Sequence, residues 1–170
     1  MILPIVKEPK PILRRKATPV GEITAEVRKL IDNMIETMHA AEGVGLAANQ
    51  VGSSLDIFVA SPDGQPGKEL VMLNTALSKR RGRNRSAEGC LSLPGVGSEV
   101  TRSAEVTAKG MDREGKQLVI EAKGLLAKIL QHETDHLAGK LYVDHLSPWK
   151  RADLLAKYKE ISDALGNVRL

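Results

Sequence analysis

At 170 residues the chain is long enough for one domain, and folding at that length buries roughly 70% of the surface that the unfolded chain exposes. Apolar residues make up 42% of the chain and charged residues 27%, which argues against disorder, and no apolar run approaches the ~20 residues of a membrane span. The single cysteine excludes an internal disulfide, so we expect a cytoplasmic protein. The net charge of +4 permits an RNA-rich partner without requiring one.

The first predicted element is a helix that follows a proline-rich N-terminal arm. Thr24 can cap this helix, and Gly43 is expected to end it. Its apolar residues recur with helical spacing at Val27, Leu30, Ile31, Met34, Met38 and Ala41. From residue 55 to residue 122 the pattern changes to short strands, with hairpin turns expected at 61–68 and 111–116.

Helical periodicity returns at 125–137, and Gly139 is expected to close this helix. A last helix is predicted over 147–165, because Ser147 can cap it and Pro148 suits its first position. Its apolar stripe is expected at Leu154, Tyr158, Ile161 and Leu165. This order predicts a single α+β domain over 1–170, with mostly antiparallel strands packed around a central helix, an N-terminal helix and a C-terminal helix.

The central helix carries the segment HETDH, which has the form HExxH. His132 and His136 are one helical turn apart, so both imidazoles can face one metal ion while Glu133 reaches a water beside it. The alternative is an amphipathic helix that carries two ordinary histidines. A third protein ligand would decide between these interpretations.

Three positions come into question for the third ligand. A histidine six residues after His136 would complete a metzincin site, but Tyr142 stands there. Glu160 on the following helix is one remaining candidate. The other is Cys90, the only thiol, since a thiolate and two imidazoles leave a fourth position open for water.

A glycine-rich segment, EGVGLAANQVG, occupies residues 42–52. No Lys-Ser or Lys-Thr pair follows it, so it is not a phosphate-binding P-loop. Its glycines can form a tight turn at the end of the first helix, or they can let the backbone approach a ligand closely. Gln50 can donate an amide N–H to an oxyanion.

Three motifs in order, GVGLAANQ, EGCLS and QHETDHLAGKLYVDHLSP, resemble those of the peptide deformylase family over nearly the whole chain. The resemblance implies a metal-dependent hydrolase that removes the formyl group from N-formylmethionine of nascent bacterial polypeptides. It also implies one Fe²⁺ ion held by Cys90, His132 and His136, with Zn²⁺, Ni²⁺ or Co²⁺ able to replace it. A metallopeptidase of the HExxH type that cleaves peptide bonds is the alternative.

The resemblance also assigns roles to other residues. Glu133 is the expected general base, and the expected donors to the oxyanion are the Gln50 side chain and the Leu91 backbone N–H. The Gly45 backbone is expected to bind the substrate's main chain. An apolar pocket for the methionine side chain is expected from Val44, Leu125 and Ile129.

Further features concern partners. The family uses its C-terminal helix to dock on the ribosome near the peptide exit, although helix 147–165 can equally serve only to pack on the sheet. The segment KRRGRNR at 79–85 is expected to be a solvated basic loop rather than an RNA contact. Gly97 departs from the larger side chain that deformylases carry there, which bears on the residues after methionine. No membrane or DNA partner is expected.

Overall fold

A computed structural model describes residues 1–167 of the chain. It contains a five-stranded antiparallel sheet in the order β1-β2-β3-β6-β7 and a separate two-stranded antiparallel sheet of β4 and β5. The helices are α1 (Ala25–Ala40), α2 (Gly124–Leu137) and α3 (Pro148–Asn167), with short 3-10 turns η1 (Pro11–Arg14), η2 (Ala48–Val51) and η3 (Tyr142–His145). The strands are β1 (Gly45–Ala47), β2 (Ile57–Ala60), β3 (Leu70–Arg81), β4 (Asn84–Glu88), β5 (Ser98–Arg102), β6 (Glu105–Met111) and β7 (Gln117–Lys123). The expected α+β class with antiparallel strands is confirmed.

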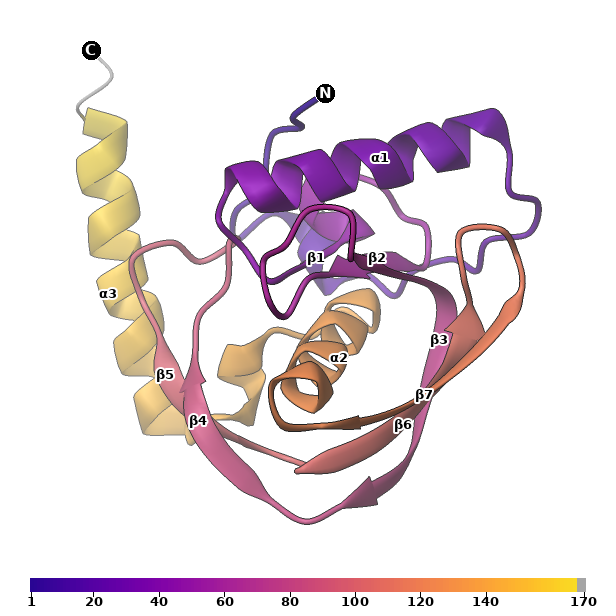
Figure 1. The fold of residues 1–170 in the computed structure, drawn as a ribbon. Helices are drawn as coiled ribbons and strands as arrows, with labels where there is room; N and C mark the ends of the chain where they lie inside the picture. Colours follow the sequence, from indigo (N-terminus) through magenta and orange to yellow (C-terminus); the bar gives the residue numbers. More distant parts are fainter. Residues whose placement is uncertain (168–170) are drawn as a thin grey trace.

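The larger sheet lies between two helices, with α1 on one face and α2 on the other (Figure 1). Strand β2 shows why: Ile57 and Val59 pack with α1, and the alternating Phe58 and Ala60 pack with α2. Successive side chains of a strand point to opposite faces, so a strand covered on both sides is apolar at every position. The sheet curves toward the side on which α2 packs.

Helix α1 begins as the sequence predicts, with the Thr24 hydroxyl accepting a hydrogen bond from Val27 N–H at 3.3 Å. Its end differs from the prediction. The residue with left-handed backbone is Glu42, at φ 55°, whereas Gly43 and Gly45 are not in that conformation. These two glycines are therefore not needed for the turn, and Gly45 begins β1, a strand that the sequence does not predict.

Helix α3 extends two residues beyond the predicted end and packs on a separate apolar cluster that includes β5, η3 and the loop after β4. Only half of its expected apolar stripe is covered. Leu154 and Tyr158 are buried, but Leu165 is 60% exposed. The stripe predicted to pack on the sheet is thus buried at its start and open at its end.

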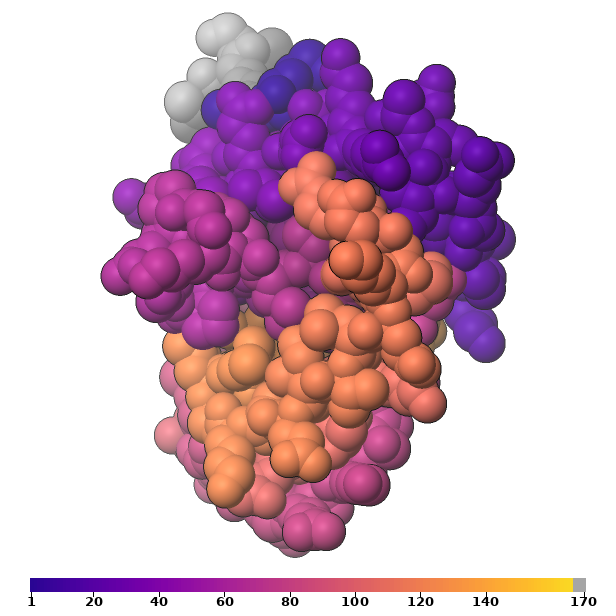
Figure 2. All heavy atoms as spheres, turned by 45° about the vertical axis from the view of Figure 1, so that its right-hand side comes forward, coloured from indigo at the N-terminus to yellow at the C-terminus, as the bar shows by residue number. Residues whose placement is uncertain are grey.

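The basic segment 79–85 is mostly strand and not the loop that the sequence predicts. It forms the end of β3 and the start of β4, joined by a sharp corner in which Lys79 and Gly82 have left-handed backbone. The corner lies at the end of the molecule opposite α1, as Figures 1 and 2 show. All of its basic residues are exposed.

Candidate metal centre

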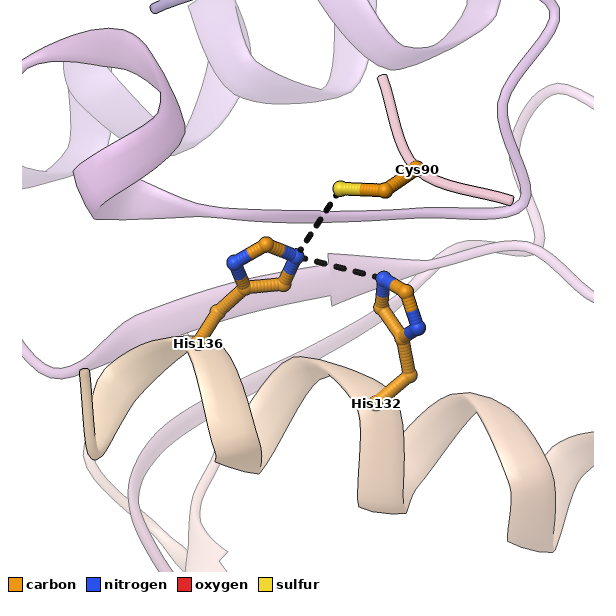
Figure 3. Close-up of side chains that lie close together, drawn as sticks. All are labelled: Cys90, His132 and His136. Carbon is orange, nitrogen blue, oxygen red and sulfur yellow. Dashed lines mark hydrogen bonds between the residues drawn. The ribbon is translucent and has the colours of Figure 1, made fainter. Parts of the chain in front are cut away.

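Three side chains from two distant parts of the chain meet at one point (Figure 3). His132 and His136 project from α2, and Cys90 comes from the loop that follows β4. The His136 Nε2 atom lies 3.3 Å from Cys90 Sγ and 3.2 Å from His132 Nε2. Within residues 1–167 no other group of three such side chains lies close enough to hold one ion, and Glu160 is exposed on α3.

The spacing of these three atoms fits a single metal ion. Nitrogen and sulfur ligands lie about 2.0 to 2.3 Å from a tetrahedral ion, so they are about 3.3 to 3.6 Å from one another. Here all three donor atoms lie within 4.8 Å of one another, and two of the separations are at or near that range. Two imidazoles and a thiol are also donors that first-row transition metals accept.

The orientation of His132 is fixed by a buried ion-pair network. Its Nδ1–H donates to Glu88 Oε1 at 2.8 Å, which leaves Nε2 facing Cys90 and His136. Glu88 is in turn held by Arg102 through two hydrogen bonds of 2.6 and 2.9 Å. Arg102 also donates to Asp135 at 2.9 Å, and Asp135 accepts a hydrogen bond from His145 at 2.7 Å.

The charges of this network shift the pKa of Glu88 and of His132. Burial raises the pKa of Glu88, but the hydrogen bonds from His132 and Arg102 outweigh it and hold the value at about 2. Burial also lowers the pKa of His132, but Cys90 and Glu88 outweigh it and raise the value to about 10. For His136, burial and the neighbouring His132 both lower the pKa well below its usual range. These shifts favour a protonated His132 and a neutral His136, so a metal ion would compete with a proton at His132.

Glu133 points into the same region from α2 and is 3% exposed. Within the described residues no donor bonds its buried Oε2 atom. Burial raises the pKa of Glu133 to about 7, against the lowering effect of His132 and Arg102. A carboxyl group with that pKa can both accept and return a proton near neutral pH.

Gln50 is held so that its amide nitrogen faces the thiol. The Ala47 N–H donates to Gln50 Oε1 at 3.0 Å, which identifies the other end of the amide as the donor. Gln50 Nε2 then lies 3.6 Å from Cys90 Sγ and donates to Ser92 Oγ at 3.1 Å. The side chain is 2% exposed, so this orientation is fixed by packing as well as by hydrogen bonds.

The glycines of the 42–52 segment are explained by close approach. A Cβ atom at Gly45 would lie 2.5 Å from Glu133 Oε1, and a Cβ atom at Gly43 would lie 2.9 Å from the Leu91 side chain. Glycine at position 45 lets β1 run this close to the Glu133 carboxylate, whereas Gly43, which precedes β1, meets only the movable end of the Leu91 side chain.

A cavity of about 550 Å³ opens beside two of the candidate ligands, Cys90 and His132. Its lining includes all of the predicted substrate residues, namely Val44, Gly45, Leu125 and Ile129, together with Gln50, Leu91 and Glu133. Val44 and Leu125 are 43% and 47% exposed, whereas Ile129 is 3% exposed and forms the floor. The apolar side chains therefore face the same space as Cys90 and His132.

Gly97 does not line this cavity. A Cβ atom there would lie 2.8 Å from the Glu88 carbonyl oxygen, because β5 passes close to the end of β4 at this point. A larger residue would require the backbone to move. This chain therefore has no side chain at position 97 with which to contact a peptide.

The sequence patterns did not assign roles to Glu88, Arg102, Asp135 or Ser92. Glu88 belongs to the motif EGCLS and lies two residues before Cys90, so the sequence itself shows an acidic residue near the thiol. Its partner Arg102 lies on the neighbouring strand β5, opposite Asn84, and only its side chain reaches Glu88. A sequence pattern does not reveal this contact.

Comparisons with known proteins agree with this geometry. The family profile described as polypeptide deformylase matches residues 2–152. A peptide deformylase of Thermodesulfovibrio yellowstonii is 48% identical over 160 residues, which cover 93% of this chain and 97% of the relative. The crystal structure of a peptide deformylase from Legionella pneumophila superposes with a TM-score of 0.94 at 40% identity and 98% coverage of both chains.

A second crystal structure, of peptide deformylase from Thermus thermophilus, is also 40% identical, with a TM-score of 0.87 and coverage of 94% of this chain and 95% of that one. The metallopeptidase alternative is not favoured by any of these matches. The chain belongs to the polypeptide deformylase family and is a hydrolase that removes the N-formyl group from newly synthesised polypeptides.

Proposed function

We propose that Cys90, His132 and His136 hold one metal ion and that this ion is Fe²⁺. The observation that supports the proposal is the convergence of one Sγ and two Nε2 atoms within 4.8 Å, beside an open cavity. Zn²⁺, Ni²⁺ and Co²⁺ suit the same donors, so these ions can replace iron without a change of ligands. Helix α2 carries two of the proposed ligands, His132 and His136, together with the acid Glu133. The strands that pack against α2 therefore support the metal centre.

A metal ion held by these residues would supply a Lewis acid and lower the pKa of a water molecule, so that hydroxide can form near neutral pH. Glu133 is the general base that takes the proton of this water and later gives it to the leaving amine. Its raised pKa of about 7 suits both steps, because the carboxyl group gains and loses a proton near the working pH. The absence of a hydrogen-bond donor to Oε2 among the described residues keeps this oxygen available for the proton.

The negative charge that develops on the formyl oxygen is stabilised by two protein donors. Gln50 Nε2 faces the cavity beside Cys90, and the backbone N–H of Leu91 makes no backbone hydrogen bond within residues 1–167. Donors that are already fixed in place need no reorganisation during the reaction.

The substrate's main chain binds along the Gly45 backbone, where a side chain would displace Glu133. Its methionine side chain enters the apolar part of the cavity formed by Val44, Leu125 and Ile129. An unbranched thioether side chain fits an irregular aliphatic pocket well.

We also propose that the protein works in the cytoplasm, where formylated polypeptides are made, and that the start of α3 docks on the ribosome near the exit tunnel. Trp149, the only tryptophan, is 88% exposed at this end of the helix, followed by the exposed Lys150 and Arg151. An exposed aromatic residue beside cations is typical of a binding surface. No described helix is long and apolar enough to cross a membrane.

The test is release of formate from formyl-Met-Ala-Ser by protein purified under argon, with the bound metal measured in the same samples. We expect activity and about one metal ion per chain, and Cys90→Ala should lose both because two ligands bind far more weakly than three. Full metal content and activity in Cys90→Ala would contradict the proposal. For iron, we expect activity to fall in air together with oxidation of Cys90, and the nickel form to stay active.

A further inference from the structure

The catalytic cavity is also bordered by residues outside the candidate site. Its lining includes Lys7 of the N-terminal arm and Pro94 of the cysteine loop. A second hollow of about 260 Å³ is lined by the same two residues and, on its other side, by α3. We call it the α3 hollow; its remaining side chains include Tyr158, Ile161 and Leu165.

The walls of the α3 hollow are tied to one another by hydrogen bonds. The Tyr158 hydroxyl donates to the Glu8 carbonyl oxygen at 2.9 Å, which joins α3 to the N-terminal arm. The Glu8 N–H donates to the Ser92 carbonyl oxygen at 2.9 Å, which joins the arm to the cysteine loop. The side chain of Ile161 packs over Gly95, where a Cβ atom would lie 3.2 Å from it. These contacts fix the walls of the α3 hollow relative to the loop that carries Cys90.

The C-terminal half of α3 exposes apolar side chains that could bind a ligand. Leu165 is 60% exposed and Ile161 is only partly buried, although both belong to the helix stripe that packs at Leu154 and Tyr158. Packing of α3 accounts for the first half of the stripe but not for the second. The family profile ends at residue 152, so these positions lie beyond the part of the chain that it matches.

The residues that follow methionine in the substrate need contacts that Gly97 cannot supply. The formyl group is bound at the metal centre, so the rest of an extended polypeptide must leave the cavity along its lining. Lys7 and Pro94 line both the catalytic cavity and the α3 hollow, so the two adjoin at these residues. Each residue of an extended chain advances roughly 3.3 Å, so a few residues are enough to leave the catalytic cavity.

We propose that the α3 hollow is a substrate subsite that binds apolar side chains of the nascent polypeptide downstream of its methionine. The proposal rests on the proposed catalytic role of the adjoining cavity. Burial of one aliphatic side chain there lowers KM with little effect on kcat, because the contact is the same in the bound substrate and in the transition state. This subsite makes the enzyme favour nascent chains that have apolar residues downstream of the methionine.

The test compares three substrates: formyl-Met-Ala-Ser, formyl-Met-Ala-Ser-Leu-Leu and formyl-Met-Ala-Ser-Ser-Ser. We expect kcat/KM for the apolar pentapeptide to exceed that for the tripeptide by roughly three- to tenfold, which corresponds to partial burial of one leucine side chain. The serine pentapeptide should match the tripeptide. In Leu165→Glu the ratio of apolar pentapeptide to tripeptide should fall to about one, since a carboxylate cannot replace the apolar contact. Normalising each variant to its own tripeptide value removes differences in folding or metal content.

Val119→Glu is the matched control, because Val119 is 57% exposed on β7 and lines neither cavity. This variant should keep the full preference for the apolar pentapeptide. A parent enzyme without that preference, or a Leu165→Glu protein that retains it, would overturn the proposal.

A binding measurement separates this proposal from the catalytic one. The dissociation constants of the product peptides Met-Ala-Ser and Met-Ala-Ser-Leu-Leu can be measured by calorimetry without any turnover. Tighter binding of the longer peptide, lost in Leu165→Glu, supports the subsite even if formate release fails. Equal binding of the two peptides refutes it even if formate release is normal.

Discussion

Replacement of Glu88 should weaken both the fold and the metal centre. Its carboxylate is 2% exposed and accepts three hydrogen bonds, two from Arg102 and one from His132. Glu88→Ala leaves the Arg102 guanidinium, 5% exposed, with Asp135 as its one remaining carboxylate. Breaking a buried ion pair in this way costs about 3 to 5 kcal/mol. Because Asp135 still compensates part of the charge, we expect a loss near the lower end, about 3 kcal/mol.

The same replacement removes the acceptor that orients His132. Loss of a hydrogen-bond partner behind a metal-bound histidine typically reduces metal affinity about 10- to 100-fold. Glu88→Gln tests this part separately, since its amide oxygen can still accept the His132 proton without the negative charge. We expect the affinity of Glu88→Gln to lie between those of the parent and Glu88→Ala.

A matched control lies on the same two-stranded sheet. Glu99 pairs with Arg85 at 2.9 Å, but both side chains are about 60% exposed, at 59% and 61%. An exposed pair contributes roughly 0 to 1 kcal/mol, so Glu99→Ala should be nearly neutral. Urea unfolding gives the free energy, and competition with a chelator gives the metal dissociation constant. If Glu88→Ala is as stable as Glu99→Ala and binds metal like the parent, the ion-pair network does not support the site.

Three further predictions concern the catalytic acid, the strand beside it and stability in acid. Glu133→Gln should keep its metal and lose about 10²- to 10⁴-fold in kcat, so metal loss or near-normal turnover would refute its role as base. Gly45→Ala should also retain metal and lose activity, because the new Cβ atom displaces the Glu133 carboxylate; Gly21→Ala, with nothing within 4 Å of its Cβ atom, is the control and should behave as the parent. Burial raises the pKa of Glu69, but its hydrogen bond with His39 and those from the backbone outweigh this and hold the pKa below 4.5. The stability that this carboxylate contributes is therefore complete above pH 4.5 and lost as the pH falls through its lowered pKa, so Glu69→Gln should flatten that part of the urea-derived stability profile.

Much of this protein could be predicted from local sequence patterns. Helix periodicity and the Thr24 cap predict α1, and the HETDH segment places His132 and His136 on one face of α2. Alternating apolar residues between turn sequences predict the antiparallel strands. These predictions succeed because hydrogen bonding and side-chain direction within a helix or hairpin depend on residues that are near in sequence.

Other features were decided only by the tertiary structure. Residue spacing alone left Cys90 and Glu160 open as third ligands and only the family resemblance favoured Cys90, whereas the path of the loop after β4 is what brings Cys90 to the histidines. The Arg102 side chain reaches Glu88 from the neighbouring strand, and Gly45 is required by the approach of β1 to α2 rather than by its own backbone conformation. Such contacts join residues that are distant along the chain, so their geometry depends on how complete elements pack and has no local signal.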